Sequence, residues 1–173
     1  MVSQTIVDYL RENDAEVEWH EHERAVTAER LAETLHVPAR QVAKPVLVKA
    51  DGRFCIALVP GNRKLDLALL ADALAAIDVR LAGESEFARL FPDCETGSQP
   101  PFGNLYFLPV VMDETLAEQE TILFRAGSHV DAIEMLVDDF VELEKPQLEP
   151  LYQQSRPANP PPRWPTTEAQ LRL

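Results

Sequence analysis

A single lysine interrupts an apolar stretch near the middle of the chain. Lys44 lies within the segment from Val42 to Leu47, VAKPVL, whose other residues are all apolar. An ammonium group beside a buried surface needs an anion to offset its desolvation. A phosphate or carboxylate of a ligand would supply that anion. An alternating strand that turns Lys44 outward into solvent explains the same pattern, so both interpretations stay open at this point.

A second candidate is a stiff turn later in the chain. The segment Gly97–Gly103 reads GSQPPFG, with a glycine at each end and two prolines between them. Glycines permit close approach of the backbone to a ligand, and prolines fix the bend. Such a loop can present N–H and C=O groups in a constant array. The alternative is a rigid connector that binds nothing.

A third candidate is the turn Gly127-Ser128-His129. Ser128 and His129 are neighbours in the chain, which does not give serine-protease geometry, and no nucleophile elbow surrounds Ser128. We therefore predict no catalytic triad. His129 could orient a water or a substrate group, or it could be a surface histidine of the turn.

Histidine and cysteine spacing favours neither a metal nor a cofactor. His20 and His22 have the i, i+2 spacing that places two imidazoles on one face of a strand, but no third ligand is evident nearby. Cys55 lies in an apolar run and is expected in the core. Cys94 lies in a polar loop, and no paired base marks it as a nucleophile. We expect no metal and no cofactor.

The charge distribution points to a local anion-binding face on an acidic protein. The net charge of −13 would repel a polyanion at long range and argues against nonspecific DNA binding. Residues 40–80 nevertheless carry seven basic and four acidic side chains, Arg63 and Lys64 among the basic ones. These groups either form a phosphate-binding face or are ordinary solvated charges.

The elements that position these residues are mixed. Asp51-Gly52 is the favoured two-residue turn between apolar runs, which predicts a hairpin of 42–50 and 53–60. We also expect helices over 3–10, 28–35, 67–75, 85–91 and 138–144, with Ser3, Thr27 and Asp66 as caps. Further strands are expected over 16–23, 79–81, 105–112, 121–125 and 130–136, and the last could instead be helical. The order lacks regular βαβ alternation and predicts an α+β fold.

The chain is long enough for one domain with a short appendage. After Lys145 the chain contains half of its 14 prolines, which is incompatible with an ordinary helix or inner strand. We therefore predict a body over residues 1–146 and an extended tail over 147–173, with Trp164 and Leu171 as possible anchors to the body or to a protein partner. No apolar run is long enough to span a membrane, the start lacks a secretory pattern, and two cysteines fit reduced thiols in a cytoplasmic protein.

Taken in order, these motifs resemble the YbaK/prolyl-tRNA synthetase-associated editing domain family. The resemblance covers roughly residues 15–146. It is carried by the segments VTAERLA (26–32), VAKPVLV (42–48), VPGN (59–62) with LDL (65–67), GSQPPFG (97–103) and FRAGSH (124–129). The family implies an α+β fold with a mixed, barrel-like sheet flanked by helices. It also implies deacylation of mischarged aminoacyl-tRNA.

The resemblance assigns roles to individual residues. Lys44 matches a family lysine that approaches the phosphate and backbone of the acceptor end. Gly97 and Pro101 match a Gly-x-x-x-Pro loop that holds the aminoacyl group and the attacking water, and some members carry a histidine near His129. Substrate binding is further expected of Gly103, Ser128, Arg63 and Lys64. The chain departs from the family at Pro45, where many members have threonine.

The chemistry suits a site without a classical nucleophile. An aminoacyl ester is labile, and its neighbouring ribose hydroxyl can help to activate water, so positioning and charge stabilisation can suffice. A binding pocket distinguishes two amino acids that differ by one methylene by only about 1–3 kcal/mol, and a separate editing step multiplies that selectivity. We therefore expect a freestanding trans-editing hydrolase acting on the aminoacyl-tRNA acceptor end. The alternative is a noncatalytic module that uses the same cleft to bind an aminoacyl or nucleotide-like ligand or to regulate a partner.

Overall fold

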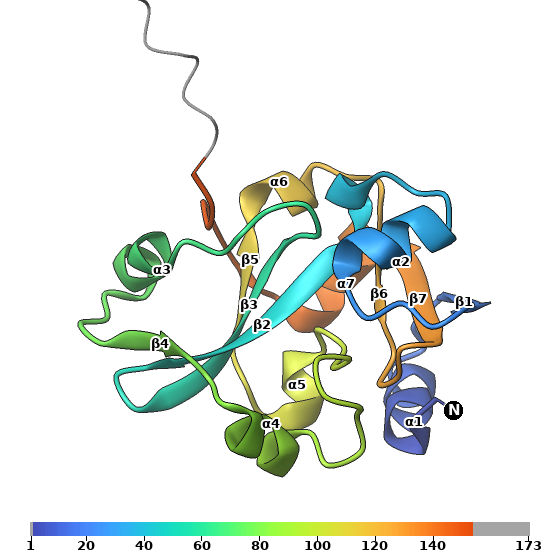
Figure 1. Cartoon of the computed structure of the whole chain (residues 1–173), viewed down its shortest axis with the longest axis horizontal. Helices are drawn as coiled ribbons and strands as arrows, with labels where there is room; N and C mark the ends of the chain where they lie inside the picture. Colours follow the sequence, from blue (N-terminus) through green and yellow to red (C-terminus); the bar gives the residue numbers. More distant parts are fainter. Residues whose placement is uncertain (1, 154–173) are drawn as a thin grey trace, which may run out of the picture.

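Two sheets organise the chain, which a computed structural model describes over residues 2–153. The larger sheet has the order β4-β2-β3-β5-β8 and the smaller one β1-β7-β6. Figure 1 shows α3 and β4 at one end of the molecule and α1 and β1 at the other. The strands are β1 (Glu18–Glu21), β2 (Ala43–Ala50), β3 (Arg53–Pro60), β4 (Val79–Leu81), β5 (Val110–Asp113), β6 (Thr121–Arg125), β7 (Asp131–Leu136) and β8 (Gln147–Glu149).

Helices cover the sheets and connect them. They are α1 (Gln4–Glu12), α2 (Ala28–Thr34), the 3₁₀ turn η1 (Ala39–Gln41), α3 (Leu67–Leu74), α4 (Glu84–Leu90), α5 (Gly103–Tyr106), α6 (Glu114–Ala117) and α7 (Val137–Glu144). The expected caps are present for two of them: the Thr27 side chain accepts from Arg30 N, and Asp66 accepts from Leu69 N. Ser3 occupies the cap position of α1, but its hydroxyl donates to Asp93 instead.

The predicted hairpin is confirmed. β2 and β3 pair antiparallel from Ala43 opposite Pro60 to Ala50 opposite Arg53. Asp51 and Gly52 have φ values of 47° and 81°, as a two-residue turn of the favoured type requires. The Asp51 carboxylate also accepts from the backbone N–H of Asp78 at 2.8 Å. The turn is thereby fixed to the start of β4.

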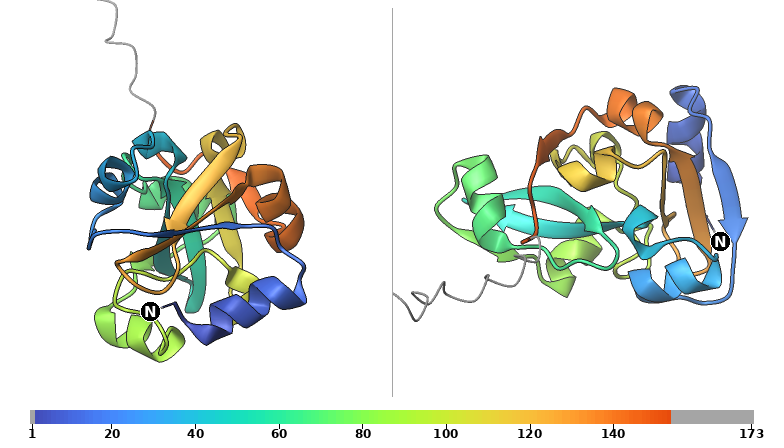
Figure 2. Two further views of the ribbon diagram at one scale, coloured as in Figure 1. Left: turned by 90° about the vertical axis from the view of Figure 1, so that its right-hand side faces the viewer. Right: turned by 90° about the horizontal axis from the view of Figure 1, so that it is seen from above.

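β3 is buried on both faces, which divides the apolar residues into separate clusters. Ile56 and Leu58 pack into the main cluster, which includes Phe102 and Phe124 at a centroid distance of 5.2 Å. The alternate residues of β3 pack on the other face under α3. Seen from above in Figure 2, the smaller sheet lies at the end of the molecule away from α3.

The α+β fold is confirmed, and the two sheets are not closed into a barrel. An isolated parallel bridge between Val42 and Leu123 connects them. This bridge lies just before β2, so the lysine-bearing strand begins at the junction of the two sheets. Among residues 2–153, no helix is long and apolar enough to cross a membrane.

The strand predicted over 105–112 was wrong in its first part, before residue 110. Residues 103–106 form α5, and the strand begins only at Val110. The cause is a tight turn: Leu108 N donates to Gly103 O at 2.9 Å, and Phe107 adopts a positive φ of 58°. The segment 130–136, which could have been helical, is a strand paired with β1 and β6.

Part of the expected tail belongs to the folded body. Residues 147–149 form β8, which pairs in parallel with β5, and Leu151 is fully buried. Apolar residues between the prolines explain this packing, because Leu148 and Leu151 can still contact the sheet. The boundary expected at residue 147 therefore falls inside the fold. The predicted anchors Trp164 and Leu171 lie outside the described residues.

Candidate functional site

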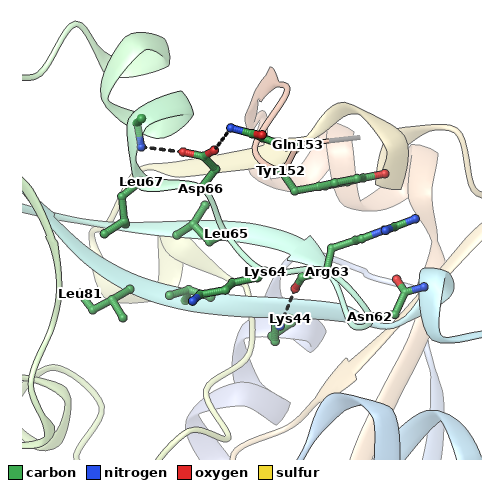
Figure 3. Close-up of a pocket in the computed structure, with 12 residues that line it drawn as sticks. Lys44, Asn62, Arg63, Lys64, Leu65, Asp66, Leu67, Leu81, Tyr152 and Gln153 are labelled. Carbon is green, nitrogen blue, oxygen red and sulfur yellow. Dashed lines mark hydrogen bonds between the residues drawn. The ribbon is translucent and has the colours of Figure 1, made fainter. Parts of the chain in front are cut away.

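A groove of about 940 Å³ opens beside β2 and contains Lys44. Its walls come from the start of β2, the segment between β3 and α3, one residue of β4 and the segment after β8. Figure 3 shows Arg63 between Lys44 and Tyr152. The lining residues are Lys44, Val46, Asn62, Arg63, Lys64, Leu65, Asp66, Leu67, Ala68, Leu81, Tyr152 and Gln153.

Lys44 is a half-buried cation without a carboxylate at ion-pair distance among residues 2–153. Its Nζ donates to the backbone oxygen of Arg63 at 2.6 Å. Burial lowers the pKa of Lys44, and the Glu29 carboxylate partly opposes this effect. The side chain is half-buried and lines the groove, and its role as an anion contact stays a prediction.

The other charged groups leave the groove net positive. Arg63 and Lys64 are exposed cations at its edge. Asp66 is the only acidic residue in the lining, and its carboxylate caps α3 and accepts from Gln153 Nε2 at 2.9 Å. The backbone N–H of Leu69 holds the pKa of Asp66 below its usual value. Asp66 is thus committed to the protein, and the cations remain available to an anionic ligand.

The loop 97–103 contacts β2 next to the lysine. Gln99 is buried, and its Nε2 donates to the backbone oxygen of Pro45 at 3.1 Å. The amide oxygen, Oε1, is buried and accepts no hydrogen bond from the part of the chain that the structure describes. Gly97 has a positive φ of 80°, and nothing lies within 4 Å of the position that a Cβ would take. The loop is therefore fixed at Gln99 and open at Gly97.

His129 is buried rather than exposed in its turn. Its backbone N–H donates to Glu95 Oε2 at 2.7 Å, and its Nε2 lies 3.0 Å from Thr96 O. Because a carbonyl oxygen only accepts, Nε2 carries the proton of the neutral ring and Nδ1 is an acceptor. Nδ1 is buried and has no hydrogen-bond partner within residues 2–153. Burial, and then the charge of Arg125, lowers the pKa of His129, so the neutral form prevails near pH 7.

A buried arginine lies four residues before His129 in the chain. Arg125, buried at the end of β6, donates to Ala25 O through Nε at 3.2 Å and Nη2 at 3.0 Å. Burial lowers the pKa of Arg125, and Glu29 opposes this effect as it does for Lys44. Glu29, on α2, thus affects the pKa of one cation on each sheet.

The structure brings some of the predicted site residues together and separates others. Lys44, Arg63 and Lys64 line one groove. Gly97, Pro101, Gly103, Ser128 and His129 are not among its lining residues. Ser128 Oγ donates to Asp131 at 2.7 Å and accepts from Val130 N at 3.2 Å, so it shapes the turn. Gly103 is required by the tight turn after α5, because a Cβ there would lie 2.2 Å from Leu108 O.

Sequence reasoning missed several residues around the site. Tyr152 and Gln153 were assigned to the tail, and their proline-rich surroundings hide their place in the groove. Gln99 was treated only as part of a loop that acts through its backbone. Glu29 and Arg125 lie inside segments quoted for the family resemblance, VTAERLA and FRAGSH, and a charged residue in each was the available signal.

The histidine pair and the cysteines behave differently from the candidates above. His20 Nε2 lies 3.1 Å from Glu134 Oε2, and Glu18, His20 and Glu134 place ligand-type atoms within 4.8 Å of one another. His22 points elsewhere, with Nδ1 at 2.6 Å from Glu23 O. Burial raises the pKa of Cys55 to about 11 and that of Cys94 to about 12. Both thiols are therefore protonated near pH 7 and are poor nucleophiles.

Comparisons with solved structures support the same fold. A protein proposed to be a trans-editing enzyme for prolyl tRNA synthetase superimposes with a TM-score of 0.78 at 19% identity, covering 89% of this chain and 100% of that one. A protein described as a candidate for signal transduction, from Marinobacter aquaeolei VT8, gives a TM-score of 0.70 at 20% identity, covering 89% of this chain and 31% of that one.

Sequence relatives include proline–tRNA ligases. Proline–tRNA ligase 1 of Streptomyces avermitilis is 46% identical over 61 residues, which cover 35% of this chain and 11% of the ligase. The ligase of Lactobacillus helveticus is 26% identical over 125 residues, covering 68% of this chain and 22% of the ligase. The chain thus corresponds to only a fifth or less of the length of most such relatives.

Fold and groove together define a small α+β domain with a basic groove on an acidic body. The sequence model described as the aminoacyl-tRNA editing domain matches residues 22–143. The chain belongs to this family, as the resemblance implied.

Proposed function

We propose that this chain is a freestanding deacylase of mischarged aminoacyl-tRNA that acts in the cytoplasm. The observation that carries the proposal is Lys44, a half-buried ammonium that lines a groove with two further cations and, within residues 2–153, bonds only to a backbone carbonyl. A phosphate of the acceptor end would supply the anion that its desolvation demands. Membership of the editing-domain family supports the same ligand.

The reaction needs no covalent intermediate. The oxygen of a water attacks the ester carbonyl, the bond from the acyl carbon to the ribose oxygen breaks, and the ribose oxygen takes up a proton. The neighbouring ribose hydroxyl can assist this transfer. Positioning the water and stabilising the developing oxyanion then account for the catalysis.

The chain's own residues would divide these tasks. Lys44 holds the acceptor-end phosphate, and the backbone from Gly97 to Pro101 positions the aminoacyl group and the water. His129, neutral near pH 7, would act by holding Thr96 beside Gly97, because its own Nδ1 is buried. Arg63, Lys64, Gly103 and Ser128 complete the proposed substrate-binding set, the glycine and the serine by shaping the backbone.

A screen of mischarged tRNAs tests the proposal. The sequence relatives make tRNA for proline, charged with amino acids other than proline, the first substrates to try. We expect the wild-type chain to release the amino acid from at least one of them and Lys44→Met to lose most of that activity. Lys49→Met is the matched control, because Lys49 lies on the same strand but contacts Phe54 and Glu86 outside the groove. Equal rates for Lys44→Met and wild type would remove Lys44 from the site.

The acidic body favours a second candidate function. A net charge of −13 weakens long-range attraction of a polyanion, which suits a noncatalytic module that binds an aminoacyl or nucleotide-like ligand in the same groove. Saturable binding of an aminoacyl-adenosine analogue without turnover on any mischarged tRNA would select this alternative.

A further inference from the structure

The segment after β8 completes the groove although it lies beyond the residues that match the family. The family model ends at residue 143, whereas Tyr152 and Gln153 line the groove opposite Lys44. Tyr152 is the one aromatic residue among the described residues that line the groove, and Gln153 adds an amide beside it. These additions belong to this chain's own C-terminal segment.

Tyr152 is held in place by strong local anchoring. β8 pairs with β5 from Val111 opposite Gln147 to Asp113 opposite Glu149. Leu151 is fully buried, and its backbone N–H donates to Asp113 Oδ1 at 2.8 Å. Its backbone oxygen accepts from Asp66 N at 2.8 Å. The residue before Tyr152 is therefore fixed from both sides, which directs the ring toward the groove.

The ring is presented with a cation beside it. The Arg63 guanidinium carbon lies 5.1 Å from the centroid of the Tyr152 ring, within the range of a cation–π contact. Tyr152 itself is only half-buried, so one part of the ring remains accessible. Figure 3 shows the ring beside Arg63 on the wall away from Lys44.

This combination matches the chemistry of unpaired RNA. Single-stranded nucleic acid is bound by cations that follow the phosphates and by aromatic rings on which bases stack. The groove supplies Lys44, Arg63 and Lys64 for the first task and Tyr152 for the second. Resting on the proposed function, we infer that Tyr152 stacks on an unpaired base of the RNA 3′ end and that Arg63 secures the adjacent phosphate.

Binding of uncharged RNA tests this role independently of hydrolysis. The probes are a fluorescent RNA hairpin with a four-nucleotide 3′ overhang and the same hairpin with a blunt end. We expect Tyr152→Ala to weaken binding of the overhang hairpin about 5- to 100-fold, the range of one lost base–aromatic stack. Tyr152→Phe keeps the ring and should bind within about twofold of wild type. The blunt hairpin should not distinguish the three proteins.

Two further variants separate stacking from folding defects. Trp19→Ala removes an exposed aromatic ring on β1, away from the groove, and should leave overhang binding unchanged. Tyr152→Leu retains apolar bulk against Arg63 but cannot stack as an aromatic ring. It should fall near Tyr152→Ala in affinity with a wild-type unfolding transition.

The outcomes distinguish this inference from the proposed function. Overhang binding by Tyr152→Ala or Tyr152→Leu within twofold of wild type would overturn the stacking role, as would equal losses for blunt and overhang RNA. Deacylation by wild type with a normal rate in Tyr152→Leu would overturn it too, while leaving the proposed function intact. Tyr152-dependent binding without any turnover would support the stacking role and reject the deacylase.

Discussion

At the scale of single residues, the tautomer of His129 determines what the turn can do. The bond to Thr96 O assigns the proton to Nε2 and leaves Nδ1 as an acceptor. A protonated ring would place a second N–H in a buried position near Arg125, which is why the pKa of His129 lies below its ordinary value. The turn is thus arranged for a neutral imidazole.

The pH dependence of stability follows from this arrangement. Because the folded-state pKa of His129 is lowered, the unfolded chain binds more protons in the window below the ordinary histidine pKa of about 6.5. We expect the free energy of unfolding to fall as the pH drops from about 6.5. His129→Gln keeps an N–H for Thr96 O but cannot titrate, so it should lose part of this slope. Urea unfolding between pH 7.5 and pH 5 measures the difference.

His20→Gln is the control for the His129 measurement, since His20 lies on β1 with Glu134 as its partner, outside this turn. A slope in His129→Gln equal to that of wild type would contradict the assignment of the pH effect to this turn.

Comparing Gly97 with Gly52 separates the effect of backbone strain on stability from an effect on deacylation. Gly97 and Gly52 have φ values of +80° and +81°, and neither has an atom within 4 Å of the position of an added Cβ. Gly97→Ala and Gly52→Ala should therefore cost a similar free energy of unfolding, about 1 kcal/mol. Only Gly97→Ala should lower deacylation, by about tenfold or more, because its loop positions the ester. Denaturant titration and single-turnover assays on both variants measure this.

Two results would count against that account of the loop. Equal deacylation rates for the two alanine variants would show that Gly97 does not act through its backbone. A loss in Gly97→Ala that matches its loss of folded protein would reduce the effect to stability.

At the scale of elements, local chemistry decided what the sequence could predict. The hairpin turn at Asp51-Gly52 and the caps Thr27 and Asp66 depend on neighbours within four residues, and all were predicted correctly. α5 was not, because its turn depends on the approach of Leu108 to Gly103. β8 was missed because prolines dominate its surroundings and its partner, β5, is distant in the chain. Long-range pairing carries no local signature.

The same division applies to the site. Lys44 and the loop 97–103 were found because a charge in an apolar run and a glycine–proline pattern are local anomalies. The contact of Gln99 with Pro45 O, and the place of Tyr152 in the groove, arise only from tertiary packing.

A buried glutamate joins three helices and makes a further prediction at this scale. Glu144, at the end of α7, accepts from the Tyr9 hydroxyl of α1 and from Asn104 N of α5 at 3.0 Å. Removing it takes this acceptor from both donors at a partly buried site. We expect Glu144→Ala to lower the free energy of unfolding by about 2 kcal/mol. Glu142→Ala, exposed on the same helix, should change it by less than about 0.5 kcal/mol.

Chemical denaturation of both glutamate variants measures these costs. A loss in Glu144→Ala no larger than that in Glu142→Ala would show that α1 and α5 do not depend on this carboxylate.

At the scale of the whole molecule, an acidic body carries one basic groove. The net charge of −13 opposes approach of RNA from a distance, whereas the three cations of the groove act only at short range. Moderate salt should therefore screen the repulsion of the body as well as weaken contacts in the groove. We therefore expect RNA binding to depend on all of the residues that line the groove. Tyr152 and Gln153, which follow β8, are among them.

Two truncations therefore differ in outcome. A chain ending at residue 153 keeps the described contacts of β8, Leu151 and Tyr152, and we expect it to fold and to hydrolyse the substrate of the full chain at a similar rate. A chain ending at residue 146 loses the pairing of β8 with β5 and the burial of Leu151. Loss of a buried leucine alone costs about 2–5 kcal/mol, so this chain should unfold at distinctly lower denaturant concentration.

Activity at a temperature where both truncated chains remain folded then shows what the segment adds. The chain ending at 146 also lacks Tyr152, so we expect its Michaelis constant for aminoacyl-tRNA to rise more than its turnover number falls. Leu151→Ala in the chain ending at 153 is the matched control: it weakens the anchoring but retains the ring. Full activity and stability in the chain ending at 146 would mean that β8 is dispensable, and the domain would then end with α7 as the proline pattern suggested.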